Sequence, residues 1–175
     1  MMQIQQLTAP PELIQRINSW VDNMSPDEWN TVSSRGNNPI PDLLHRGFET
    51  LFFPHYTCNE LGLTDYILST KNNTILPSAT FSNDYADVWV NRYYYGDTTP
   101  PHSHAYDYSG VIMLMIPDDS PSLEFFYPNP GDDTYYPPQF VGNTLVFPAS
   151  LGHQVYTQYT HNERRTLSFN LMIAE

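Results

Sequence analysis

Three histidines are the residues of this sequence best suited to chemistry. His102 and His104 are separated by one residue in a proline-rich stretch, and His153 follows much later in the chain. In an extended segment, side chains at positions i and i+2 point the same way, about 6.6 Å apart along the backbone. Two imidazoles from one segment and one from a distant strand can therefore meet at one ion. Imidazoles without thiolates suit Fe(II), although Mn, Co, Ni or Zn would also bind.

The alternative explanation is that these histidines are surface residues in a proline-rich turn, which usually holds for an isolated histidine. The His-x-His pair, followed by a histidine after Gly142 and Pro148, favours a metal site. We expect the remaining histidines to be ordinary polar residues that bind no metal. His45 and His55 lie in or near predicted helices, and His161 lies in a polar turn.

A second chemical signal is the strand pattern near the end of the chain. Strict alternation places one set of side chains on one face, and these are Arg164, Thr166, Ser168 and Asn170; the other face carries Arg165, Leu167 and Phe169. A buried arginine beside hydroxyl groups needs an anion, and a planar guanidinium suits a carboxylate bound at two points. A salt bridge to one of the many acidic residues is the alternative. Together with the histidines, this face predicts a site for a dicarboxylate.

These stretches resemble the 2-oxoglutarate–Fe(II) oxygenase superfamily, and most closely its small single-domain bacterial and phage group. The matching segments are Trp89-Val90-Asn91, His102-Ser103-His104, Ser109-Gly110-Val111, residues 142–148 with His153, and residues 164–170. The resemblance implies a double-stranded β-helix, with Fe(II) and 2-oxoglutarate as cofactors. It also implies a hydroxylase of unknown substrate that couples O₂ activation to decarboxylation of 2-oxoglutarate to succinate.

The same resemblance implies roles for individual residues. His102 and His153 would bind iron, and Arg164 would pair with the far carboxylate of 2-oxoglutarate. Thr166 would add a hydroxyl group to that carboxylate. Asn91 and Tyr93, on the strand that leads to the site, are further candidate contacts of the co-substrate.

The third metal ligand departs from the pattern of the superfamily. Most members have an aspartate or glutamate where this chain has His104. Either His104 is the ligand or Asp107 takes its place, and the spacing favours His104. A neutral third ligand makes the centre more positive than the usual triad.

Two other functions remain open. Gly96-x5-His102-x-His104 and Gly142-x5-Pro148 also resemble the two cupin motifs, although Tyr108 and Ser109 stand where cupins usually have a glutamate. A cupin-type metalloprotein that does not use 2-oxoglutarate, such as a dioxygenase or an isomerase, is one alternative. A non-enzymatic β-sandwich binding module is the other.

The elements that must position these residues change in type along the chain. Residues 1–76 predict mainly helices, which run from Pro10 to Met24, from Pro41 to Phe52 and within residues 59–70. From residue 80 the pattern predicts strands at 87–95, 111–116, 123–127, 154–158 and 166–173, with a loop at 128–138. Two further strand-like runs, 140–141 and 144–147, flank Gly142. Helices followed by strands predict an α+β fold, here a jelly roll buttressed by N-terminal helices. We expect one domain over residues 1–175, with its jelly-roll core at 80–175.

The charge, the cysteine content and the apolar runs of the sequence limit the kinds of partner that we expect. A net charge of −12 repels phosphate backbones, so we expect no nucleic-acid partner. Cys58 is the only cysteine, which excludes an internal disulfide and a thiolate cluster and fits a reducing compartment. No apolar run approaches ~20 residues, and the first residues do not resemble a signal peptide. We therefore expect no membrane partner and a cytoplasmic location, in a bacterium or a phage-infected cell. The expected partner is a small-molecule or peptide side-chain substrate, and a homodimer is an open option.

Overall fold

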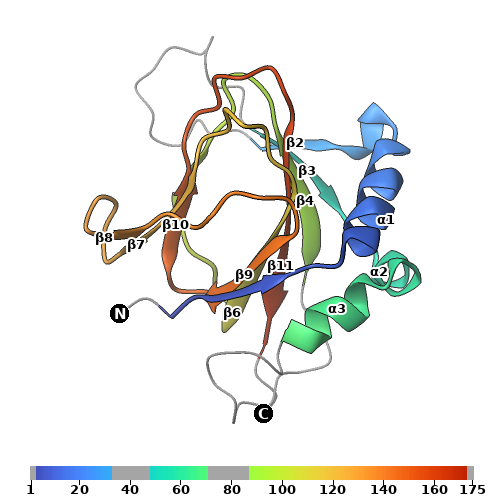
Figure 1. Cartoon of the computed structure of the whole chain (residues 1–175), viewed down its shortest axis with the longest axis horizontal. Coiled ribbons are helices and arrows are strands. Elements are labelled where there is room, and N and C mark those ends of the chain that lie inside the picture. The colour runs from blue at the N-terminus through green and yellow to red at the C-terminus, as the bar shows by residue number, and fades with distance from the viewer. Residues whose placement is uncertain (1–2, 33–47, 71–86, 173–175) are drawn as a thin grey trace.

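Two antiparallel sheets face each other in the computed structural model, which describes residues 3–32, 48–70 and 87–172 (Figure 1). The larger sheet has the order β1 (Gln5–Thr8), β9 (Asn143–Pro148), β6 (Tyr108–Met115), β11 (Arg164–Leu171), β4 (Val88–Tyr93), β3 (Phe48–Phe52) and β2 (Asn30–Val32). The smaller sheet has the order β5 (Thr99–His102), β10 (Gly152–Val155), β7 (Leu123–Tyr127) and β8 (Asp133–Tyr135). This is a double-stranded β-helix, as the sequence predicts.

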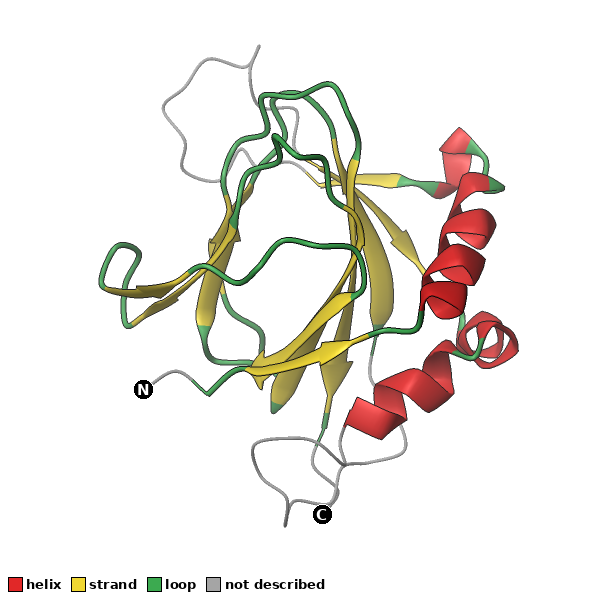
Figure 2. Ribbon diagram, in the orientation of Figure 1, coloured by secondary structure: helices red, strands yellow, loops and turns green. Residues whose placement is uncertain are grey.

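The helices cover the outer face of the larger sheet (Figure 2). They are α1 (Pro11–Asp22), the short 3₁₀ helix η1 (Pro26–Glu28), α2 (His55–Leu61) and α3 (Leu63–Thr70). Helix α1 begins with a proline at its first position, where no N–H is needed, and buries one apolar stripe that includes Leu13, Ile17 and Val21. The stripe packs against outward-facing strand residues such as Val90 and Leu167. No described helix is long and apolar enough to cross a membrane.

Alternation along the strands gives the larger sheet two different faces. On β11, Leu167 and Phe169 join the core under the helices. Arg164, Thr166 and Ser168 lie on the opposite face and line a cavity between the two sheets. A second apolar core, which includes Met113, Phe125, Leu145 and Phe147, fills the rest of the space between the sheets. The polar face predicted for this strand is therefore an interior face.

Most of the predicted elements are present. The first helix and the strand at 123–127 are confirmed, and β4, β6, β9, β10 and β11 each overlap a predicted strand. The segment 59–70 lies in two helices, α2 and α3, separated by Gly62, which adopts a left-handed conformation with φ of 78°.

The predicted helix that begins at Pro41 is wrong over residues 48–52, which form strand β3. Its residues 41–47 lie outside the described part of the chain. The spacing of Leu51 and Phe52 with Phe48 fits a helical face, but it fits a strand as well. In the structure Phe48 and Phe52 face the cavity, while Leu51 faces the helices.

Four short strands were not predicted. The prolines of Thr99–His102 argue against a strand, but β5 is an edge strand, where proline is tolerated. Strand β8 lies within the predicted loop at 128–138 and is the other edge of the smaller sheet. Strands β1 and β2 are the two edges of the larger sheet and are only 4 and 3 residues long. All four are short edge strands, for which sequence patterns carry little information.

Candidate metal centre and co-substrate cavity

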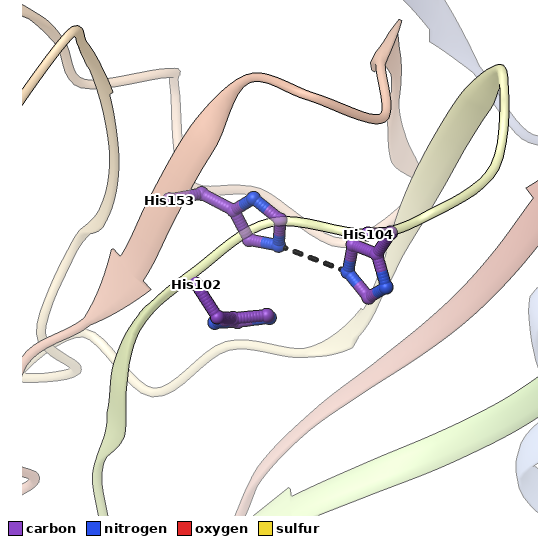
Figure 3. Close-up of side chains that lie close together, drawn as sticks. All are labelled: His102, His104 and His153. Atoms are coloured by element: carbon purple, nitrogen blue, oxygen red, sulfur yellow. Dashed lines mark hydrogen bonds between the residues drawn. The ribbon is translucent and has the colours of Figure 1, made fainter.

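The register between two strands brings His102 and His153 together. Strands β5 and β10 are antiparallel neighbours, and His102 lies directly opposite His153, with 4.2 Å between the ring centroids. His104 lies two residues beyond β5, where its backbone N–H donates to Ala149 O at 2.8 Å. The Nε2 atoms of His104 and His153 are 3.3 Å apart (Figure 3).

The candidate ligand atoms of the three histidines all lie within 4.8 Å of one another. Two nitrogens that are each about 2.1 Å from a metal, at a right angle, are about 3 Å apart. The observed separation between His104 and His153 is therefore close to what a shared ion requires. The three rings come from β5, from β10 and from the loop that follows β5.

Backbone carbonyls set the proton positions of two of these rings. Nδ1 of His102 lies 2.8 Å from Pro100 O, and Nδ1 of His153 lies 3.1 Å from Leu151 O. A ring nitrogen beside a carbonyl must be the donor, so Nδ1 carries the proton and Nε2 keeps its lone pair. Each ring is thus held in the tautomer that coordinates through Nε2.

Burial also keeps the imidazoles neutral. Desolvation, and then the neighbouring His102, lower the pKa of His153 to about 3. The same two causes lower the pKa of His104 to about 4. Burial lowers the pKa of His102 as well, and its hydrogen bond to Pro100 opposes this shift. Near neutral pH, a metal does not have to displace protons from these rings.

The structure brings His104, not Asp107, into the group with His102 and His153. Asp107 is exposed in the bend before β6, and its carbonyl oxygen accepts a hydrogen bond of 3.1 Å from Ala149 N. Two of the other histidines are remote from the group: His55 begins α2, and His161 stacks on Tyr95 with 4.8 Å between ring centroids. His45 lies outside the described residues.

The histidines line a cavity of about 290 Å³ between the two sheets. The residues proposed from the sequence as co-substrate contacts line the same cavity, and they are Asn91, Tyr93, Arg164 and Thr166. Tyr93 lies opposite Arg164 across the β4–β11 pair, and Asn91 lies opposite Thr166. The metal ligands and the anion-binding candidates, predicted from separate stretches of sequence, thus line one cavity.

Arg164 is completely buried, and only part of its guanidinium is satisfied. Nη1 donates to Ser120 Oγ at 3.0 Å, to Pro121 O at 3.1 Å and to Gln139 Oε1 at 2.8 Å. Nε and Nη2 have no partner among the described residues. These two nitrogens share one edge of the guanidinium and direct their N–H bonds in parallel, which matches the two oxygens of a carboxylate.

The unsatisfied edge of Arg164 is chemically informative because a buried charge without a partner is costly. Burial lowers the pKa of Arg164 to about 10, and Tyr93 opposes this shift, so the side chain remains protonated at neutral pH. Of the described residues that line the cavity, none is an aspartate, glutamate or lysine. In a chain with a net charge of −12, this cavity wall is cationic and suits an anion.

Two neutral groups complete the region around Arg164. The hydroxyl groups of Tyr93 and Thr99 are hydrogen-bonded at 2.7 Å, which links the two sheets. Nδ2 of Asn91 donates to Ser168 Oγ at 3.2 Å, and Oδ1 of Asn91 is buried without a partner in the described part of the chain. Since a hydroxyl group can donate as well as accept, the amide can turn and present Nδ2 to the cavity.

Several residues of the site were not predicted from the sequence. Ser120 and Gln139 hold Arg164, and Phe48 and Phe52 line the cavity. The first two lie in irregular segments with no pattern that would indicate contact with residue 164. Phe48 and Phe52 belong to the segment predicted as a helix, and a correct strand prediction would have placed both on one face.

Comparison with known proteins supports the architecture. No family model matches the sequence, and no curated protein matches it. An oxidoreductase of the 2-oxoglutarate–Fe(II) oxygenase family from Burkholderia pseudomallei is similar in structure, with a TM-score of 0.68, 16% identity and coverage of 97% of this chain and 85% of that chain. A prolyl-4-hydroxylase from Pseudomonas putida gives a TM-score of 0.67, 15% identity and coverage of 97% and 93%.

A third similar structure is SnoK, a non-heme α-ketoglutarate-dependent carbocyclase from nogalamycin biosynthesis. Its TM-score is 0.75 at 8% identity, with coverage of 98% of this chain and 79% of that chain. At such low identity the likeness concerns the fold. The chain therefore has the double-stranded β-helix fold of the 2-oxoglutarate–Fe(II) oxygenases.

Proposed function

We propose that this protein is a 2-oxoglutarate-dependent Fe(II) oxygenase that hydroxylates a substrate not yet identified. The observation that carries the proposal is the unpaired Nε–Nη2 edge of Arg164, buried in the same cavity as three neutral imidazoles. A metal site alone would suit many reactions. A metal site that shares a cavity with a buried, unpaired guanidinium edge suits a co-substrate with an anionic group at each end.

The residues present fit both cofactors. Fe(II) would be held by His102, His104 and His153, which offer three lone pairs. The far carboxylate of 2-oxoglutarate would pair with Arg164, with hydroxyl groups from Thr166 and Tyr93 beside it. When bound, iron and 2-oxoglutarate supply the oxidising chemistry, in which O₂ is activated and 2-oxoglutarate is decarboxylated to succinate.

The protein itself binds, orients and shields these groups. The fork of Arg164 fixes one end of the diacid, so the other end is directed along the cavity toward the histidines. The apolar walls formed by Val111, Leu123 and Phe147 limit the access of water. His104 as third ligand replaces a carboxylate by a neutral group, so more of the positive charge of the metal is available to an anionic co-substrate.

Anaerobic titration of the metal-loaded protein with 2-oxoglutarate tests the proposal. We expect the visible charge-transfer band of the Fe(II)–2-oxoglutarate chelate in the wild type. Arg164→Met should require at least about 100-fold more 2-oxoglutarate, because two charge-assisted hydrogen bonds are lost. Arg165→Lys is the matched control, since Arg165 lies on the opposite face and pairs with Asp22 at 2.8 Å.

Three other results of these experiments would contradict the proposal. Stoichiometric iron without a chelate band would overturn the proposal in favour of a cupin-type metalloprotein that does not use 2-oxoglutarate. A purified protein that takes up no transition metal would overturn it in favour of a binding module. A band that forms equally well in Arg164→Met would show that the diacid is held elsewhere.

A further inference from the structure

A row of aromatic rings runs from the protein surface to the candidate metal centre. Phe52 lines the cavity, yet 55% of it is exposed. It lies opposite Trp89 in the β3–β4 register, with 6.1 Å between the ring centroids. Trp89 in turn lies 5.9 Å from the ring of His104. The cavity therefore reaches the surface beside Phe52, and the rings continue from there to the third histidine.

The opposite end of the cavity has a different character. Arg164 is fully buried there, and Tyr93, its cross-strand neighbour, is 2% exposed. Phe48 stacks on Tyr93, with 5.2 Å between the ring centroids. Along β4, Tyr93 and Trp89 are four residues apart, which corresponds to about 13 Å of extended chain. The buried end and the aromatic end are therefore separate, and the buried end is the one suited to the diacid.

Among the described residues, the aromatic end offers surface area but no counter-charge. Apart from Arg164 at the far end, every described residue that lines the cavity is uncharged or a histidine. An ammonium or carboxylate group of a free amino acid that enters this end of the cavity would lose part of its hydration without gaining an oppositely charged partner among the described lining residues. By contrast, the faces of Phe52 and Trp89 favour a flat ring, which can stack on them or direct its C–H bonds toward them.

We propose that the aromatic end, formed by Phe52 and Trp89, is the substrate subsite, and that it binds a neutral, flat apolar ring carried by the substrate. A ring on this surface lies next to His104, so its C–H bonds are close to the candidate metal position. Free amino acids are disfavoured because the described residues of the subsite offer no partner for either of their charges. The inference rests on the proposed function, which makes the ring the group that is oxidised.

A matched pair of probes tests this subsite. N-acetylphenylalaninamide and phenylalanine carry the same ring, but only the first has no charge. We expect calorimetry of the metal-free protein to show at least tenfold tighter binding of the neutral probe. Phe52→Ala should weaken that binding at least fivefold, whereas Phe140→Ala should not. Phe140 is a suitable control because it is 40% exposed and is not among the residues that line the cavity.

The probe experiment tests the ring subsite independently of the proposed function. Equal binding of the two probes, binding of neither probe, or equal effects of Phe52→Ala and Phe140→Ala would each overturn the ring subsite. None of these outcomes affects the chelate band of the wild type. Conversely, the absence of that band would overturn the function, while the comparison of probes is made without metal. Thermal unfolding of each variant shows that a loss of binding is not a loss of fold.

Discussion

The side-chain oxygen of Gln139 accepts a hydrogen bond of 2.8 Å from Nη1 of Arg164. Ser120 Oγ and Pro121 O accept from the same nitrogen. Three acceptors from two loops thus occupy one end of the guanidinium. Rotation of the side chain is restricted, and Nε and Nη2 remain as the donors for a ligand. The loops between strands, rather than the strand that carries Arg164, set the direction of the anion-binding edge.

Gln139 should therefore act as a positioning residue for the co-substrate. Gln139→Leu removes one neutral acceptor, which is worth about 1 kcal/mol, or roughly a fivefold rise in the Kd for 2-oxoglutarate. The Kd for Fe(II) should not change. Titration of the chelate band measures both quantities. Gln15→Leu, on the exposed side of α1, is the control, and a merely structural role of Gln139 would lower the unfolding temperature without changing the Kd.

Tyr93 and Tyr94 are neighbours on the chain whose hydroxyl groups have different partners. Tyr93 donates to or accepts from Thr99, while Tyr94 donates to Glu163 at 2.6 Å. Burial raises the pKa of Tyr93 to about 12, and the bond to Thr99 opposes this shift, so the hydroxyl group is neutral at working pH. Each Tyr→Phe change should lower the free energy of unfolding by about 1 kcal/mol. Only Tyr93→Phe should also weaken 2-oxoglutarate binding, by a few-fold; an equal effect from Tyr94→Phe would contradict this role.

The third ligand can be identified by a direct comparison of two variants. His104→Ala should weaken Fe(II) binding by at least about 100-fold, because a ligand affects affinity more than the outer groups that orient ligands, which contribute 10- to 100-fold. Asp107→Asn should have little effect, since Asp107 lies outside the histidine group. Equilibrium dialysis with Fe(II) under anaerobic conditions measures both constants. The reverse order of effects would assign the ligand to Asp107.

The metal-free protein should lose stability as the pH falls. The folded state keeps His153 neutral because its pKa is lowered to about 3, whereas the unfolded chain binds a proton below about pH 6.5. The unfolded state therefore binds more protons between these values, and the free energy of unfolding falls by up to about 1.4 kcal/mol per pH unit for this group.

His153→Gln removes this contribution, so its stability should depend less steeply on pH than that of the wild type. Urea unfolding in the presence of a chelator, at several pH values between 7.5 and 5, measures the difference in slope. His161→Gln, at an exposed position, controls for the loss of a histidine. Parallel pH profiles for the wild type and His153→Gln would show that His153 takes up a proton as readily in the folded state as in the unfolded chain, and would contradict its lowered pKa.

Much of the architecture was predictable because the interior strands carry strong patterns. Residues 111–115 of β6 are a continuous apolar run, β7 is apolar except for Glu124, and β11 alternates between an apolar and a polar face. The edge strands were harder to predict, since half of their backbone groups need no partner strand and their side chains are weakly patterned. In β3, three apolar residues, Phe48, Leu51 and Phe52, fit both periods, and only tertiary contacts decide between them.

The residues of the candidate site also fall into those that the sequence could predict and those that it could not. His102, His104 and Arg164 could be proposed because an i, i+2 spacing and a buried cation have direct chemical meaning. The acceptors that orient Arg164 could not, because Ser120 and Gln139 reach it through the path of two loops, which no local pattern specifies. The aromatic subsite was also beyond the sequence, since it depends on the register between β3 and β4.

His102 and His153 belong to the smaller sheet, and Arg164 belongs to the larger one. A molecule held by the metal at one end and by the guanidinium at the other therefore braces the two halves of the sandwich against separation. At a concentration 100 times its Kd, such a brace adds about 2.7 kcal/mol to the free energy of unfolding. The supply of a common metabolite would thus set how long the folded chain survives heat and proteolysis, as well as how fast it works.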